Sequence, residues 1–135
     1  MELIAGIDLG TTNSLIALFN PKTGKAETIK QIGKNALVPS IVHFDSAGNA
    51  LVGSAAKSFL ISDPEHTIYS VKRLMGRSYQ DVKDHQGYFG FKIIDEDQAQ
   101  LVKIRVGNRS CSPIELSSLI LKELKQQAEI ALLAE

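Results

Sequence analysis

The sequence predicts an α/β protein, with a mixed β-sheet near its N-terminus, short helices and a hairpin in the middle, and one long C-terminal helix. Two observations carry this prediction. Short apolar runs with turn-forming residues between them fill residues 2–44, a pattern typical of sequential strands in an antiparallel or mixed sheet. Towards the end of the chain, apolar residues recur at helical spacing instead.

The first part of the chain contains the predicted strands. They are residues 3–9, Ser14–Phe19, Ala26–Ile32, Ile41–Phe44 and Ala50–Val52. The turns between them are rich in glycine, asparagine, proline and serine, and are expected at Asn20–Gly24, Gly33–Asn35 and Ser46–Asn49. Pro39 restricts the backbone before the fourth strand.

The middle of the chain predicts short helices. Ser54 is expected to cap a helix over residues 55–61, which an Asp-Pro pair ends. Thr67 is expected to cap a second helix over residues 68–75, which a glycine ends. A polar helix is expected at Tyr79–His85.

A hairpin is predicted after these helices, because the apolar runs at 92–94 and 101–106 flank the turn-prone stretch DEDQAQ. Three aromatic residues are expected to pack under it: Tyr88, Phe89 and Phe91. The histidines have no metal-ligand spacing. His43 is expected on a strand face, and His66 and His85 in exposed polar settings.

The last helix has the clearest signals. Ser112 and Glu115 form a capping box, with proline at the first helical position. The apolar residues Leu116, Leu119, Ile120 and Leu124 follow at helical spacing. The helix has no glycine or asparagine stop and carries acidic residues at its negative end, so we expect a chain cut inside or just after its last helix.

Composition narrows the class of protein. The 135 residues suit one domain or part of one, and 44% hydrophobic residues can form a core. Fifteen basic residues balance fifteen acidic ones, so no general attraction to nucleic acid or anionic membranes is expected. The single cysteine, Cys111, is interpreted as a small, partly buried side chain. With neither a membrane-spanning run nor a signal peptide, the expected location is the cytoplasm.

The stretch DLGTTNS lies between two predicted strands and has the residues of an anion-binding loop. It lacks the lysine of a P-loop and the three spaced glycines of a dinucleotide-binding turn. A phosphate loop would use backbone N–H groups and the hydroxyls of Thr11 and Thr12, with Asp8 holding Mg²⁺ through water. A plain hairpin whose threonines bond their own backbone fits the residues equally well.

In HTIYSVKRLMGR, the apolar residues Ile68, Val71, Leu74 and Met75 would form one helical stripe. Lys72 would lie beside this stripe on the same helix, directed partly inwards, and a phosphate could serve as the anionic partner of its ammonium group. The residues alone favour the other interpretation, a lysine whose stem lies along apolar surface while its ammonium group reaches water.

GIDLGTTNS together with HTIYSVKRLMGRSYQD closely resembles the seventy-kilodalton heat-shock chaperone family, the DnaK type. LVPSIV, LVGSAAK and SPIELSSLILKELKQQAE fall in the same order, so the resemblance runs through almost the whole chain. Sugar kinases and other actin-like proteins share the D-x-G-T-T loop, whereas the KRLMGR segment favours the chaperones. SVKRLMGRS is also similar to the specialised bacterial branch that serves iron–sulfur cluster assembly.

The resemblance implies part of an actin-like, ribonuclease-H-like ATPase domain. Residues 1–39 and 112–135 would belong to its phosphate-binding core subdomain, and 40–111 to an inserted α+β subdomain. The second phosphate loop, the second lobe, the interdomain linker and the peptide-binding domain of the family have no counterpart in this sequence. We therefore do not expect this chain alone to hydrolyse ATP.

The resemblance also implies roles for single residues. The residues that would cradle the β- and γ-phosphates of ATP or ADP are Gly10, Thr11, Thr12 and Asn13. Asp8 would lie near Mg²⁺ and its waters, and Lys72 would reach the γ-phosphate and help to position the attacking water. Arg73 would support this arrangement. The implied partners of a full-length protein are unfolded client peptides, a J-domain co-chaperone and a nucleotide exchange factor.

Two alternatives from other functional classes remain. A metabolite kinase of the same superfamily would use a substrate hydroxyl in place of water, but the intact KRLMGR segment argues against it. The isolated chain could instead be a non-catalytic folding or interaction fragment.

Overall fold

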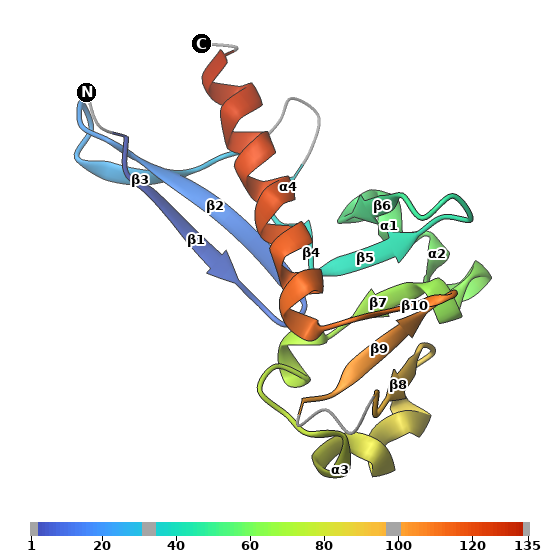
Figure 1. The fold of residues 1–135 in the computed structure, drawn as a ribbon. Coiled ribbons are helices and arrows are strands. Elements are labelled where there is room, and N and C mark those ends of the chain that lie inside the picture. The colour runs from blue at the N-terminus through green and yellow to red at the C-terminus, as the bar shows by residue number, and fades with distance from the viewer. Residues whose placement is uncertain (1–2, 31–34, 97–100, 134–135) are drawn as a thin grey trace.

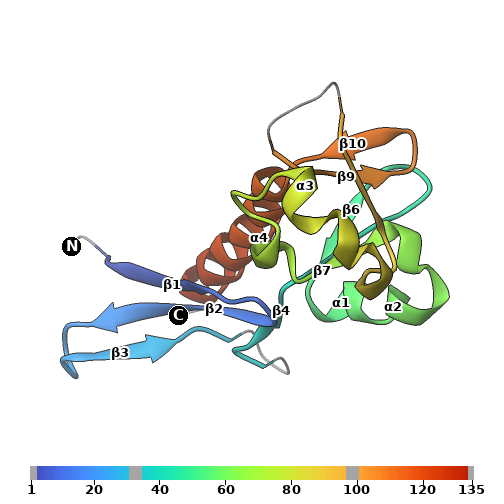
Figure 2. The ribbon, with the colours of Figure 1, turned by 90° about the horizontal axis from the view of Figure 1, so that it is seen from below.

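The computed structural model describes residues 3–30, 35–96 and 101–133, and over these ranges the protein is a mixed α/β structure. Figure 1 shows a long helix, α4 (Pro113–Leu133), with the first β-sheet on one side of it and two smaller sheets on the other. The view from below in Figure 2 shows the same arrangement, with the first sheet extending away from the remaining elements. The start of β1 and the end of α4 lie on the same side of the molecule in both views.

The first sheet confirms the predicted succession of strands and tight turns. Its strands are β1 (Ala5–Leu9), β2 (Asn13–Asn20), β3 (Lys25–Thr28) and β4 (Val38–Pro39). β2 pairs with each of the other three strands, and all the described pairs are antiparallel, so over these residues the sheet is antiparallel rather than mixed as predicted. The predicted third strand ends early, at Thr28 rather than Ile32, and most of the predicted turn at Gly33–Asn35 lies outside the described residues.

The second sheet lies around a buried central strand. In it β5 (Ile41–Phe44) pairs with β6 (Ala50–Val52) and with β7 (Thr67–Tyr69), both antiparallel. The predicted β5–β6 hairpin is confirmed. Gly48 in its turn has φ 84°, a left-handed conformation that glycine adopts without steric cost.

The helix predicted over residues 68–75 is wrong. Thr67 begins strand β7 instead of capping a helix, and a single 3₁₀ turn (Val71–Arg73) follows it. Ile68 pairs with Val42 of the central strand and is 1% exposed. Between the strand and the turn, Ser70 has φ 54°, which a right-handed helix cannot contain.

The predicted helix over residues 55–61 is two short helices, α1 (Ser54–Lys57) and α2 (Phe59–Ser62). The predicted cap at Ser54 is wrong, because the preceding Gly53 is the N-cap. Its φ of 81° is unfavourable for other residues, and its carbonyl accepts the N–H groups of Ala56 and Lys57 at 3.1 Å. Asp63 follows the end of α2, as the sequence predicted.

The third sheet contains the predicted hairpin. It consists of β8 (Lys92–Ile94), β9 (Lys103–Val106) and β10 (Arg109–Cys111), paired antiparallel in chain order. The polar helix predicted at Tyr79–His85 begins as α3 (Tyr79–Val82) and continues as a 3₁₀ helix (Lys83–Tyr88).

The predicted aromatic packing is confirmed for two residues and wrong for the third. Phe91 is 1% exposed, and Phe89 is partly buried and stacks on it with ring centroids 4.9 Å apart. Tyr88 is 77% exposed. It occupies the last position of a 3₁₀ turn, from which its ring extends into solvent.

Helix α4 begins as the sequence predicted. The N–H of Glu115 donates to Ser112 Oγ at 3.1 Å, and the N–H of Ser112 donates to the Glu115 carboxylate at 2.6 Å, which completes the capping box. The predicted apolar side of the helix is buried, with Leu116, Ile120 and Leu124 at most 1% exposed.

The capping box predicts a pH dependence of stability. The pKa of the Glu115 carboxyl lies below its usual value, chiefly because the carboxylate accepts the Ser112 N–H. The unfolded chain therefore binds this proton at a higher pH than the folded chain does. The stabilisation is present above the unfolded pKa, near 4.5, and is lost as the pH falls through the folded pKa.

Glu115→Gln keeps a capping acceptor but cannot titrate, so thermal unfolding should show a shallower loss of stability between about pH 5 and about pH 3. Glu129→Gln, on the exposed last turns of the same helix, is the matched control. An equally shallow profile for both variants would contradict the prediction.

One hydrophobic core connects the three sheets with α4. It contains Ile16 and Val38 of the first sheet, Val42 of the second, Ile104 of the third and Leu124 of α4. The division into residues 1–39 with 112–135, and 40–111, stays a prediction. Within the described residues, no helix is long and apolar enough to cross a membrane.

Candidate functional site

The stretch DLGTTNS forms the turn of the β1–β2 hairpin. Leu9 pairs with Ser14, and the four residues between them, Gly10–Asn13, form the loop. A Cβ atom at Gly10 would lie 2.0 Å from the backbone carbonyl oxygen of Asn13. Because this distance is far inside van der Waals contact, the loop can close only around glycine.

Ser40, between β4 and β5, holds the loop from one side. Its hydroxyl donates to the Gly10 carbonyl at 2.8 Å, and its backbone N–H donates to the Thr12 carbonyl at 2.9 Å. The Ser40 hydroxyl also forms a 2.8 Å hydrogen bond with that of Ser14. Both serines are buried, at 4% and 1% exposure.

The donors of the loop remain available on its outer side. Within the described parts of the chain, no acceptor engages the backbone N–H groups or the hydroxyls of Thr11 and Thr12. Thr12 and Asn13 are exposed, and Thr11 is half-buried. Since the protein already engages the Gly10 and Thr12 carbonyls, the loop presents donors to an incoming anion.

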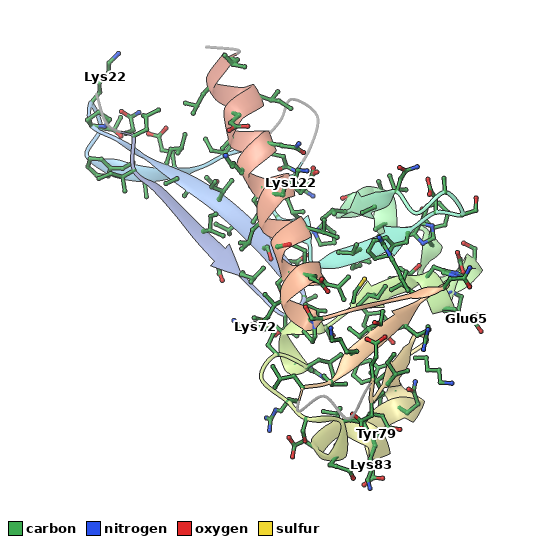
Figure 3. All side chains as sticks on the ribbon, in the orientation of Figure 1. Lys22, Glu65, Lys72, Tyr79, Lys83 and Lys122 are labelled. Carbon is green, nitrogen blue, oxygen red and sulfur yellow. The ribbon has the colours of Figure 1, made fainter. Side chains whose placement is uncertain are left out.

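Lys72 reaches this loop from a distant part of the sequence. Its Nζ donates to the Leu9 carbonyl at 3.0 Å, across 63 positions of the chain. Figure 3 shows Lys72 beside the turn of the hairpin, near the N-terminal end of α4. The sequence prediction that a lysine comes to the loop from elsewhere therefore agrees with the geometry.

Asp8 is an exposed residue of β1 and pairs with Leu15, one position before the Leu9 carbonyl that Lys72 contacts. An exposed carboxylate suits a hard cation such as Mg²⁺, which prefers oxygen ligands and keeps several of its waters. These residues thus fit the metal that the sequence predicted.

Arg73 is placed differently from Lys72. Its exposed side chain lines an open hollow of about 450 Å³. Residues of the segment 69–89 line the hollow, among them Tyr69, Arg77, Asp81 and Phe89. The supporting role of Arg73 thus stays a prediction, without a contact to the loop in its favour.

The histidines and the cysteine have structural positions. His43 is buried, bonds Thr67 Oγ1 at 3.0 Å and stacks on Phe59. His66 is half-buried and pairs with Asp63 at 2.8 Å, so its expected exposed setting is only partly correct. The described residues contain no group of three or more His, Cys, Asp or Glu side chains that could hold a metal. Burial raises the pKa of the Cys111 thiol, which makes it a poor nucleophile.

Together, these residues form a candidate anion site. The turn of the hairpin contains two threonine hydroxyls and backbone N–H groups, and the Lys72 ammonium group reaches the residue just before it, a set of donors that suits the oxygens of a phosphate chain. Sequence reasoning missed Ser40, because a buried serine near a proline gives no local signal of a contact with a loop 30 positions away.

A mixed α/β chain with such a loop has the features of a phosphate-binding protein. The family model described as Hsp70 protein matches residues 4–135, and the chain belongs to this family. Membership confirms the resemblance read from GIDLGTTNS and KRLMGR and places the chain in a family of ATP-binding chaperones with the actin-like ATPase fold. The metabolite-kinase alternative is not favoured.

Proposed function

We propose that this chain supplies the phosphate-binding part of the ATPase domain of a DnaK-type chaperone. The 3.0 Å contact between Lys72 Nζ and the Leu9 carbonyl carries the proposal, because it brings a cation to a loop that has none of its own. In the complete protein, ATP hydrolysis would be coupled to the binding and folding of client peptides. A J-domain co-chaperone and a nucleotide exchange factor would be its partners, and the cytoplasm its location.

The proposed roles follow from the chemistry of the loop. The N–H groups and hydroxyls of Thr11 and Thr12, with Gly10 and Asn13, would bind the β- and γ-phosphate oxygens of ATP. Lys72 has three N–H donors, of which one is used by Leu9, so two remain for the γ-phosphate and the attacking water. Asp8 would orient waters around Mg²⁺, which when bound neutralises charge on the phosphate oxygens.

Calorimetric titration with Mg²⁺-ATP tests the proposal on the wild-type chain and on Asp8→Ala and Lys72→Ala variants. Each variant should bind about 10- to 100-fold more weakly, because a charge-assisted contact contributes about 1.5–3 kcal/mol. Lys122→Ala is the matched control, since it removes an exposed lysine of α4 that Figure 3 shows away from Lys72.

An equal loss of affinity in Lys122→Ala would point to a general charge effect and contradict the proposed site. Absence of binding, from a wild-type chain whose circular dichroism shows that it is folded, would refute ATP binding by this chain on its own. Family membership would stand in either case, since it rests on the match over residues 4–135.

A further inference from the structure

Ser40 lies where the chain passes from the first sheet to the second. It follows β4, which pairs with β2 of the first sheet, and it precedes β5, the central strand of the second sheet. At 4% exposure it directs both its hydroxyl and its N–H at carbonyls of the candidate phosphate loop. No role in this loop follows from its sequence position.

The hydrogen bonds of Ser40 have a defined direction. A serine hydroxyl has one proton to donate. Since the Ser40 hydroxyl donates to the Gly10 carbonyl at 2.8 Å, it must accept the hydroxyl proton of Ser14. The result is a buried chain from Ser14 to Ser40 to the Gly10 carbonyl, in which each bond polarises the next.

The strand that begins next to Ser40 also pairs with the backbone segment that leads to Lys72. Ile41, next to Ser40, pairs with Tyr69 of β7. Tyr69 is followed by Ser70, in the left-handed conformation, and then by the 3₁₀ turn that contains Lys72. Ser40 is therefore bonded to the loop on one side, and joined through one strand pair to the lysine segment on the other.

We propose that Ser40 is a positioning residue that holds the phosphate loop in its binding conformation and in register with Lys72. The inference rests on the proposed ATP-binding function. In a trans peptide group the N–H points away from the carbonyl, so by engaging the Gly10 and Thr12 carbonyls Ser40 directs the N–H groups of Thr11 and Asn13 away from itself. The loop is thus organised before any phosphate arrives, and binding need not order it.

The first test needs no nucleotide. In the free chain, ¹⁵N relaxation should give Thr11 and Thr12 amides the order parameters of rigid backbone, about 0.8, and Ser40→Ala should lower them to about 0.6 or less. The amide of Ile104, buried in β9, is the internal reference and should not change. A general loosening of the fold would lower all three values.

Ser14→Ala is the matched control, because it removes an equally buried hydroxyl yet leaves the bond from Ser40 to Gly10 in place. It should change the loop order parameters much less than Ser40→Ala does. If Ser40→Ala does not fold, Ser40→Cys retains a side chain of similar shape with a weak donor and should show the same change in smaller degree.

The second test measures Mg²⁺-ATP affinity by calorimetry. Ser40→Ala should weaken binding about tenfold, and Ser14→Ala should weaken it about threefold at most. Ser40→Thr, which retains the hydroxyl, should recover much of the loss. Order parameters or affinity unchanged by Ser40→Ala would overturn the inference. A wild-type chain that binds no ATP, while Ser40→Ala still loosens the loop, would refute the proposed function and leave Ser40 as the residue that holds the loop.

Discussion

Gly10→Ala is expected to lower the affinity of the chain for Mg²⁺-ATP by about 100-fold, the order of effect seen when reacting groups are misplaced by about 1 Å. The added Cβ would lie 2.0 Å from the Asn13 carbonyl oxygen, so one side of the loop must move by more than an ångström. This movement would break the alignment of the N–H donors with the phosphate oxygens. Calorimetric titration at a fixed Mg²⁺ concentration measures the change.

Gly6→Ala is the matched control for this prediction. Gly6 lies in the same hairpin, four positions earlier, and a Cβ there meets nothing within 4 Å. Its affinity should stay close to that of the wild type. Wild-type affinity in Gly10→Ala would show that the hairpin turn takes no part in binding.

Leu124→Ala is expected to have the largest effect on stability, a loss of about 3 kcal/mol in the free energy of unfolding. Leu124 is 0% exposed on α4 and belongs to the core that connects the three sheets. The truncation removes buried apolar contacts and leaves a cavity where helix and sheets meet. Since small domains are stable by only about 5–15 kcal/mol, urea unfolding should show a clearly lower midpoint.

Leu121→Ala provides the comparison for this change. Leu121 lies on the same helix and is 37% exposed, so its truncation leaves less of a cavity. The expected loss is about 1 kcal/mol. Equal losses for the two variants would mean that α4 does not pack on the sheets through the side that contains Leu124.

The local patterns of the sequence predicted most elements correctly, and the main failure has a physical reason. Ile68, Val71 and Leu74 have helical spacing and are all buried, yet they belong to a strand and a 3₁₀ turn with its C-cap. A strand residue that faces the core, followed by a turn with three residues per repeat, produces the same spacing as an α-helix. The pairing of Ile68 with Val42 decides between them, and it is a long-range contact.

The difference between local and long-range contacts also decides which features of the candidate site could be predicted from the sequence. The glycine, the hydroxyls and the hairpin turn lie within a few positions of one another, so DLGTTNS alone predicted a tight loop that fits an anion site or a plain hairpin equally well, and the family resemblance favoured the anion site. The contacts that hold this loop come from Ser40 and Lys72, which lie 30 and 63 positions from their acceptors. Family resemblance predicted that Lys72 comes to the loop, and neither resemblance nor pattern predicted the contact of Ser40.

The hydrogen bond from Lys72 to the Leu9 carbonyl also has a consequence for the thermodynamics of binding. A free lysine side chain carries about 2 kcal/mol of rotamer entropy, and a phosphate that captured it from solution would have to order it. Here the bond to Leu9 already restrains the side chain in the folded chain, and within the described residues no other acceptor engages its ammonium group. If Lys72 binds phosphate as proposed, part of the ordering of its side chain would precede binding, and less of the binding enthalpy would be offset by lost side-chain freedom.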